Sequence, residues 1–281
     1  MRTAERILLG LNRCFKPPVH HFNLQNDGEK SYAMWQFEKG RETVKFFLER
    51  YTEEEMFTGK QVCDVGCGAG GKSLYYASRG AEHVTGLEIL PQYGPQAEAL
   101  ANELGLADKF TFLCRDAANT GLPDESFDTV IMNDAMEHVA DPKAVLQECA
   151  RILKPGGRLY VNFPPYYHPY GAHLSDLIAV PWVHAFFRDE TLIAVYKRLA
   201  QTVPDGAERV RFRISRGDDG REVLSYINRM TLKRFHALRE AAPMAVEYYR
   251  EVPLRPFLAP GAKLPVFREL LVKMAVCVFV K

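Results

Sequence analysis

Between Gln61 and Phe163, short apolar stretches alternate with amphipathic stretches of helical period. The apolar stretches have the length of buried strands, and glycine, proline or polar residues separate them from their neighbours. This pattern predicts strands at residues 61–65, 83–88, 109–114, 127–133 and 158–163. It predicts helices at residues 70–79, 95–104 and 141–153. Strands that alternate with helices form a doubly wound, parallel sheet, so we expect an α/β fold with helices on both faces.

The pattern outside this region is less regular. Residues 31–51 have helical spacing, which predicts an amphipathic cover helix. The 67 residues from Pro164 to Met230 make a connection far longer than usual, with an aromatic and histidine-rich start, an apolar middle and a charged second half. Alternating charges at 205–222 predict a solvated hairpin or loop. We divide the chain into an N-terminal helical cover, a cofactor-binding core, a lid insertion and a C-terminal completion of the sheet: 1–58, 59–163, 164–230 and 231–281.

Composition narrows the class of protein. The chain has 281 residues, is 47% hydrophobic and 25% charged, and has a net charge of +1, so no strong field attracts nucleic acid or anionic lipid. No stretch is long and apolar enough to span a membrane, and the start of the chain lacks the pattern of a secretory signal. The six cysteines include no C-x-x-C pair, which suits reduced thiols. We therefore expect a cytoplasmic protein without a nucleic-acid partner.

The glycine-rich stretch at residues 61–73, QVCDVGCGAGGKS, leads from a predicted strand into a predicted helix. Such a turn brings backbone N–H groups and a helix N-terminus to a ligand. Its spacing fits three ligands: a dinucleotide, through Gly66-x-Gly68-x-x-Gly71; a nucleoside triphosphate, through Gly66-x-x-x-x-Gly71-Lys72-Ser73; or S-adenosylmethionine. Asp64 precedes the glycines, and a carboxylate there would repel a phosphate but attract an ammonium and a sulfonium. This charge favours S-adenosylmethionine.

Polar residues end the other predicted strands. Ligands of open α/β sheets bind beyond the carboxyl ends of the strands, so these residues are expected to surround one site. Glu88 can accept hydrogen bonds from two ribose hydroxyls, and Asp116 can accept one from the adenine amino group. Ala117 offers a backbone N–H to a ring nitrogen, and Asn133 ends the fourth strand. Tyr32 and Gln36 of the cover helix are candidates for contact beside the glycine turn.

Several motifs resemble those of class I S-adenosylmethionine-dependent methyltransferases of the small-molecule branch called type 11. They are Val62–Gly70 (VCDVGCGAG), Leu122–Asp128 (LPDESFD), Glu137-His138-Val139 and Arg151–Gly157 (RILKPGG). The resemblance covers roughly residues 60–163. It implies a seven-stranded, mostly parallel sheet with an antiparallel last strand, for which residues 232–240 supply a helix and 244–250 and 270–280 supply strands. It implies S-adenosylmethionine contacts at Asp64, Gly66, Cys67, Gly68, Gly70, Glu88, Ile89, Asp116, Ala117 and Asn133.

Methyl transfer to a hydroxyl benefits from a base with a pKa near neutrality, which histidine provides. His168 and His173 of the insertion are the leading candidates, followed by His138. Tyr166 and Tyr167 are candidates to orient a small, partly hydrophobic acceptor. For any one of these histidines, a hydrogen-bonded structural role is the alternative.

A metal site is not expected, although the i, i+3, i+4 spacing of Asp134, Glu137 and His138 would place three ligands on one helical face. Four alternatives stay open: C- or N-methylation of an isoprenoid, quinone or other natural product; an NAD- or NTP-binding protein; a non-catalytic cofactor-binding scaffold; and a homo-oligomer formed through the insertion.

Overall fold

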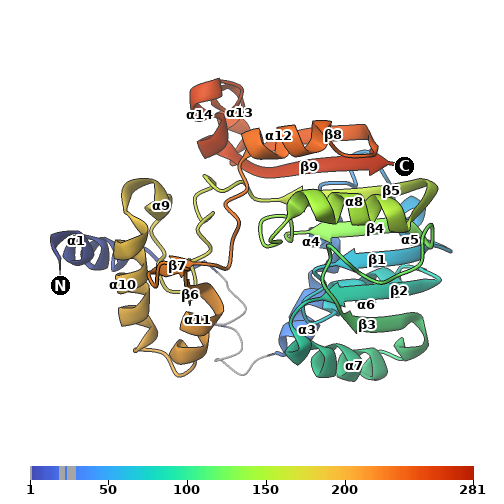
Figure 1. The fold of residues 1–281 in the computed structure, drawn as a ribbon, viewed down its shortest axis with the longest axis horizontal. Coiled ribbons are helices and arrows are strands. Elements are labelled where there is room, and N and C mark those ends of the chain that lie inside the picture. The colour runs from blue at the N-terminus through green and yellow to red at the C-terminus, as the bar shows by residue number, and fades with distance from the viewer. Residues whose placement is uncertain (1, 19–22, 24–29) are drawn as a thin grey trace. The chain divides into compact units, whose positions relative to one another are not determined.

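A seven-stranded sheet runs through the larger of two units of the chain (Figure 1). The structure is a computed structural model that describes residues 2–18, 23 and 30–281. The strand order is β3-β2-β1-β4-β5-β9-β8. The strands are β1 (Gln61–Val65), β2 (His83–Glu88), β3 (Phe110–Cys114), β4 (Phe127–Asn133), β5 (Leu153–Phe163), β8 (Ala245–Pro253) and β9 (Val272–Val280).

Strand β1 lies at the point where the direction of winding changes. It pairs in parallel with β2 on one side and with β4 on the other. The pairs β2–β3 and β4–β5 are also parallel, whereas β9 runs antiparallel to β5. The predicted mostly parallel, seven-stranded sheet with an antiparallel last strand is therefore confirmed. In this topology the ligand crevice lies beyond the carboxyl ends of β1 and β4.

Helices connect and cover these strands because each has one apolar face. Val62 of β1, Leu74 of α6 and Ile131 of β4 are fully buried in one core. Local signals set the helix ends: Asp141 accepts hydrogen bonds from the N–H groups of Lys143 and Ala144, and so caps α8. The helices of this unit are α3 (Tyr32–Glu38), α4 (Gly40–Val44), α5 (Glu53–Phe57), α6 (Gly71–Ser78), η1 (Pro91–Tyr93), α7 (Gly94–Glu103), η2 (Ala107–Lys109), α8 (Pro142–Ile152) and α12 (Leu232–Glu240).

The single cover helix predicted at residues 31–51 is wrong. The segment contains α3 and the short α4, and turns follow from residue 45. The break coincides with a close contact to α6, since a Cβ atom at Gly40 would lie 2.1 Å from Cγ of Tyr75. Helical spacing alone could not show this contact, because its partner lies 35 residues away in the chain.

The predicted start of the fifth strand at residue 158 is also wrong. Strand β5 begins at Leu153, pairs there with Phe127, and resumes regular pairing at Arg158 after an irregularity. Gly156 has φ of 77°, which a residue without Cβ adopts at little cost. The glycines therefore form a bulge within the strand.

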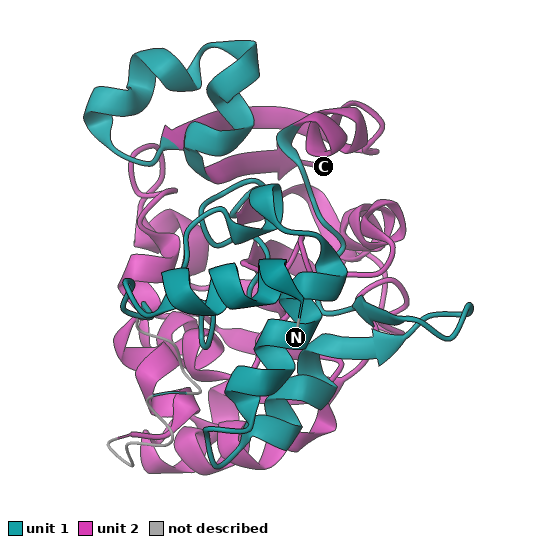
Figure 2. Ribbon diagram, turned by 90° about the vertical axis from the view of Figure 1, so that its left-hand side faces the viewer, with its two compact units in different colours: residues 1–28, 164–232, 253–273 teal, residues 29–163, 233–252, 274–281 magenta. Residues whose placement is uncertain are grey.

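The second unit comprises residues 1–28, 164–232 and 253–273, and Figure 2 colours it teal. Its described core joins Leu8 of α1 to Leu192 and Tyr196 of α10. This unit thus groups residues 1–28 with the insertion. The division of the chain into four segments stays a prediction. The elements are α1 (Thr3–Asn12), α9 (Val183–Phe186), α10 (Asp189–Ala200), α11 (Gly206–Arg213), β6 (Ile214–Arg216), β7 (Glu222–Leu224), η3 (Pro256–Leu258), α13 (Ala259–Ala262) and α14 (Pro265–Leu271).

A buried ionic network crosses this second core. Asp176 is buried and accepts hydrogen bonds from Tyr196 Oη at 2.8 Å and Arg209 Nη1 at 3.3 Å. Nη2 of Arg213 lies 3.0 Å from Oδ1, the other carboxylate oxygen of Asp176. The hairpin predicted within residues 205–222 is present as β6 and β7, but the prediction of a solvated segment is wrong for Arg209 and Arg213. Charge alternation indicated exposure, whereas Asp176 provides a buried counter-charge.

Among the described residues, no helix combines the length and the apolar character that crossing a bilayer requires. All six cysteines are free thiols, and four of them are buried. The prediction of reduced thiols therefore agrees with the structure.

We predict that Asp176→Ala lowers the free energy of unfolding by about 3–5 kcal/mol, because it leaves two buried guanidinium groups without this counter-charge. Urea unfolding followed by circular dichroism measures the change. Asp219→Ala, which removes an exposed partner of Arg221, is the control and should change stability by less than about 1 kcal/mol. Equal effects of the two substitutions would contradict this account.

Candidate functional site

The glycine turn is held against the end of β2. The N–H groups of Gly66 and Cys67 both donate to the carbonyl of Leu87, at 2.8 and 3.0 Å. Gly66, Gly68 and Gly70 have φ of 76°, 56° and 78°, conformations that favour glycine. The side chain of Cys67 is buried, so only its backbone is available at the turn.

The carboxylate of Glu88 fastens the turn. One oxygen accepts a hydrogen bond from the N–H of Gly68 at 3.0 Å, and the other accepts from Ile89 and Leu90 at 2.8 and 3.1 Å. Burial raises the pKa of Glu88, and the three amide hydrogen bonds oppose that rise. The side chain of Ile89 is exposed. The structure thus brings together the first glycines and the acid that were predicted to share a site.

Helix α3 packs directly on the same turn. Gln36 is buried and its Oε1 accepts a hydrogen bond from the N–H of Gly71 at 3.3 Å. A Cβ atom at Gly68 would lie 3.0 Å from Nε2 of Gln36 and 3.6 Å from the ring of Tyr32. At Gly71 it would lie 1.9 Å from the carbonyl oxygen of Ala33. Tyr32 and Gln36 therefore pack beside the glycine turn, and their contact with a ligand stays a prediction.

The carboxylate of Asp64 is not open at the glycine turn, contrary to the prediction. Its side chain is 1% exposed, and it accepts a hydrogen bond of 2.6 Å from the hydroxyl of Ser73 on α6. Burial raises the pKa of Asp64 to about 6. An open negative charge that repels phosphate is thus not the reason to reject a phosphate ligand.

A different observation argues against the two phosphate ligands. In a nucleoside-triphosphate site the Ser73 hydroxyl would bind Mg²⁺, but here it is fully buried and donates to Asp64. The N-terminus of α6 is covered by α3, since the N–H of Gly71 donates to Gln36. A phosphate at this helix end would have to displace both contacts.

The ends of β3 and β4 carry the remaining predicted residues of this unit. Asp116 is exposed, and its Oδ1 accepts a hydrogen bond of 2.8 Å from the N–H of Ala118. Ala117 between them is half-buried. Asn133 is buried, and its Nδ2 donates to Oδ2 of Asp134 at 3.0 Å. Asn133 is the last residue of β4, the strand that pairs with β1.

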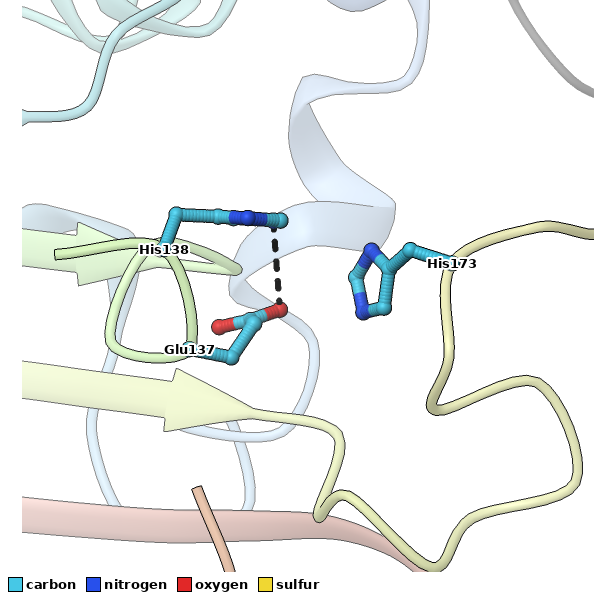
Figure 3. Close-up of side chains that lie close together, drawn as sticks. All are labelled: Glu137, His138 and His173. Atoms are coloured by element: carbon cyan, nitrogen blue, oxygen red, sulfur yellow. Dashed lines mark ion pairs between the residues drawn. The ribbon is translucent and has the colours of Figure 1, made fainter. Parts of the chain in front are cut away.

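The predicted helical face of Asp134, Glu137 and His138 is wrong, because the segment after β4 is a turn in which Asp134 has φ of 49°. Figure 3 shows the ion pair within this turn, where Nε2 of His138 lies 3.8 Å from Oε1 of Glu137. Burial raises the pKa of Glu137 well above its ordinary value, and the charge of Asp134 adds to the rise. The turn therefore presents an acid that favours its protonated form beside a histidine.

The insertion gathers aromatic and imidazole rings within its own unit. The ring of Tyr166 lies 5.1 Å from that of Tyr167 and 4.8 Å from that of His184, measured between centroids. Nδ1 of His168 accepts a hydrogen bond of 3.2 Å from the N–H of Tyr170. Burial lowers the pKa values of His168 and His184 to about 4.

These values bear on the predicted bases. Neutral His168 accepts at Nδ1, so its proton must lie on Nε2, and a pKa of about 4 makes it a weak base at neutral pH. His173 has φ of 52° and packs near Tyr226, with centroids 6.1 Å apart. His184 was not among the predicted bases, although the cluster of Tyr166, Tyr167 and His168 before it was a usable signal.

Comparison with known proteins identifies the family of the core. Residues 63–161 match the family model described as a methyltransferase domain. This part of the chain is a class I S-adenosylmethionine-dependent methyltransferase domain of the type 11 branch. Its cofactor is therefore S-adenosylmethionine.

Named relatives match the same region. The ubiquinone biosynthesis O-methyltransferase of Idiomarina loihiensis is 39% identical over 116 residues, which are 41% of this chain and 46% of that protein. The tocopherol O-methyltransferase of Arabidopsis thaliana, a chloroplastic protein, is 33% identical over 147 residues, which are 52% of this chain and 41% of that protein. The chain thus spans less than half the length of these curated relatives.

Among solved structures, the [4+2]-cyclase SpnF has a similar fold. It superposes with a TM-score of 0.55 at 18% identity, and the match covers 100% of this chain and 97% of SpnF. At this identity the likeness shows the fold alone.

The residues of the methyltransferase domain suit its cofactor. The strand ends offer the oxygens of Glu88 and Asp116, which can accept hydrogen bonds from uncharged hydroxyl and amino groups. The glycine turn leaves no space for a Cβ atom at Gly66, where it would lie 2.7 Å from Cβ of Ala135. The turn therefore presents backbone, and the acceptors at the strand ends suit the hydroxyl and amino groups of an adenosyl group.

We predict that Asp64→Asn increases stability at neutral pH. Burial raises the folded-state pKa of Asp64 above its ordinary value, so the folded state binds the proton more tightly than the unfolded state. Stability is therefore lost as pH rises from about 4 to about 6, and the loss reaches at most about 3 kcal/mol. Asparagine lacks this titration, so the free energy of unfolding of the variant relative to wild type should grow over that range.

Urea unfolding at a series of pH values measures this difference. Asp108→Asn, at an exposed position of η2, is the control and should give a difference that is constant with pH. A constant difference for Asp64→Asn as well would show that Asp64 titrates normally.

Proposed function

We propose that this protein transfers the methyl group of S-adenosylmethionine to a hydroxyl oxygen of a small, partly hydrophobic organic acceptor. The observation that carries the proposal is the arrangement at the strand ends, where Glu88 binds the glycine turn, Asn133 ends β4 and Asp116 follows the end of β3. Two relatives of the domain have O-methyltransferase in their names, one for ubiquinone biosynthesis and one for tocopherol, which supports an oxygen acceptor.

On this proposal the chain's own residues bind and orient the cofactor. Bound S-adenosylmethionine supplies a methyl group on a positively charged sulfur, which a nucleophile takes in line with the carbon–sulfur bond. Three of the about four lone-pair sites of Glu88 accept from the backbone, which leaves one on Oε2 for a ribose hydroxyl. Asp116 and the N–H of Ala117 bind the adenine, while Asn133 and the turn at Gly66 and Gly68 hold the methionyl part. The set is completed by the backbone at Cys67 and Gly70, with Ile89, Tyr32 and Gln36. Asp64 supports the turn from beneath through Ser73.

The acceptor is proposed to meet the aromatic start of the insertion. Tyr166 and Tyr167 would shape its apolar part. His168 would donate a hydrogen bond from Nε2, because its Nδ1 already accepts one. The base that removes the hydroxyl proton is then His138 or His173. His138 lies beside Glu137, with its Nε2 3.8 Å from Oε1 of that acid.

Other activities make different expectations. Methylation at carbon or nitrogen of an isoprenoid, quinone or other natural product would use the same cofactor residues. It would not require a base that removes a hydroxyl proton. A non-catalytic scaffold would bind the cofactor and release no S-adenosylhomocysteine with any acceptor. An NAD- or NTP-binding protein would bind those nucleotides more tightly than S-adenosylmethionine. The burial of Ser73 argues against an NTP site.

The first test is calorimetric binding of S-adenosylhomocysteine. We expect binding by the wild type, and Glu88→Gln should weaken it by about 10–100-fold, because a charged acceptor of hydrogen bonds is lost. Glu98→Gln on the exposed face of α7 is the matched control and should bind as the wild type does. Tighter binding of NAD or ATP than of S-adenosylhomocysteine would refute the proposal.

The second test separates the histidines. With a catechol as the acceptor and release of S-adenosylhomocysteine as the readout, substitution of the base by glutamine should lower kcat by about 10²–10⁴-fold. The same substitution at His168 should act mainly on KM, since a donor to the acceptor is lost. Calorimetry confirms that each variant still binds the cofactor. Near-wild-type kcat for both His138→Gln and His173→Gln would show that neither residue is the base.

A further inference from the structure

Four large apolar side chains are exposed within one short helical segment. Residues 254–271 contain η3, α13 and α14, and their exposed members are Phe257, Leu264, Val266 and Phe267. Phe257 and Val266 are 78% and 80% exposed. Among the described residues, the other such group is Ile7, Leu11 and Phe15, whose exposed fractions of 41–52% are lower than those of Phe257 and Val266. We call residues 254–271 the apolar hairpin.

The apolar hairpin is a built element and not a frayed stretch. The N–H of Leu254 donates to the carbonyl of Leu271 at 2.8 Å, which joins its two ends. Within it, a Cβ atom at Gly261 would lie 2.9 Å from Cδ1 of Leu271, so α13 packs closely on α14. Leu258 and Leu271 are half-buried, whereas Phe257 and Val266 are exposed. The hairpin therefore has an inner apolar side and a second, outward apolar set.

Two contacts anchor the apolar hairpin to the rest of its own unit. Nε1 of Trp182 donates to the carbonyl of Leu270 at 3.4 Å, and the N–H of Leu232 donates to Oε2 of Glu269 at 3.0 Å. The position of α14 is thus held by the side chain of Trp182 in the insertion and by the backbone N–H of Leu232 at the start of α12. Exposure of its apolar residues is therefore a property of the folded unit.

The charges around these residues have one dominant sign. Residues 254–271 include Arg255, Lys263 and Arg268, and their one acid is Glu269. That acid accepts a hydrogen bond from the backbone, while Arg255 and Lys263 are exposed next to Phe257 and Leu264. Exposed apolar tips with adjacent cations fit a surface that is apolar inside and anionic outside.

We infer that the apolar hairpin docks on the surface of an anionic phospholipid bilayer. Phe257, Leu264, Val266 and Phe267 enter the boundary between headgroups and acyl chains, while Arg255 and Lys263 meet the lipid phosphates. The hairpin lies in the interface and does not cross it. This docking goes beyond the proposed function and does not depend on it, because neither cofactor nor acceptor takes part.

Sedimentation with vesicles tests the inference. We expect the wild-type protein to partition onto vesicles of phosphatidylcholine mixed with phosphatidylglycerol. Phe257→Ser combined with Val266→Ser should lower the partition coefficient roughly tenfold or more, because two apolar side chains no longer leave water. Phe186→Ser on α9 is the matched control, since Phe186 is also 78% exposed, and it should change partitioning by less than about twofold.

The electrostatic part is tested separately. Arg255→Gln combined with Lys263→Gln should lower partitioning onto the mixed vesicles by about tenfold and leave partitioning onto pure phosphatidylcholine unchanged. The tryptophan emission of Phe257→Trp should shift to shorter wavelength with mixed vesicles, relative to wild type, whereas that of Phe186→Trp should not. Circular dichroism verifies that each variant is folded.

Three outcomes would overturn the inference: no partitioning of the wild type, an equal loss with Phe186→Ser, or dissociation of a dimer by the double serine variant without any effect of vesicles. The last outcome, detected by sedimentation velocity, would assign the apolar hairpin to contact with a second copy of the chain. Because the measurements need no cofactor, their outcome does not depend on whether the protein transfers a methyl group.

Discussion

The close approach of α3 to the glycine turn is the constraint on which the cofactor site depends. At Gly71 the carbonyl oxygen of Ala33 occupies the space that a side chain would need, and at Gly68 the side chain of Gln36 does so. The missing Cβ atoms let a helix from before the first strand cover the turn that follows it. Glu88 then holds the turn from the other side through the N–H of Gly68. The backbone at the end of β1 is thereby fixed before any ligand arrives.

Carboxylates around this turn show how burial divides similar groups into different roles. Asp64 is buried beneath the turn, bonded to Ser73, with its pKa raised to about 6. Glu88 is partly buried and spends its oxygens on three backbone amides. Asp116, in contrast, is exposed at the end of its strand. One acid therefore supports the turn from below, one connects two strand ends, and one is open to a ligand.

The smaller unit is stabilised in a different way from the sheet. Its short helices enclose a modest apolar core, and Asp176 with Arg209 and Arg213 places charges inside it. Such a network costs desolvation, and each member depends on the others. The apolar hairpin, in the last segment of this unit along the chain, has large apolar residues outside the core. This unit thus has both buried charges and exposed apolar groups, the reverse of a simple hydrophobic pattern.

The sequence by itself determined the sheet and its family. Strands β1, β2 and β4 begin and end at the predicted residues, because a strand buried on both faces is largely apolar and stands out from its polar and glycine-rich neighbours. The strand-end residues followed from the parallel topology, which gathers the carboxyl ends at one edge. The motifs then identified a methyltransferase domain and its cofactor.

Only the tertiary structure decided the direction of Asp64, the break at Gly40, the turn at Asp134 and the burial of Arg209. Each of these depends on a partner distant in the chain or on a single backbone conformation. Periodicity reports which face of an element is apolar. It does not report which residue from elsewhere fills the adjacent space, and that neighbour sets the environment of a carboxylate or a guanidinium.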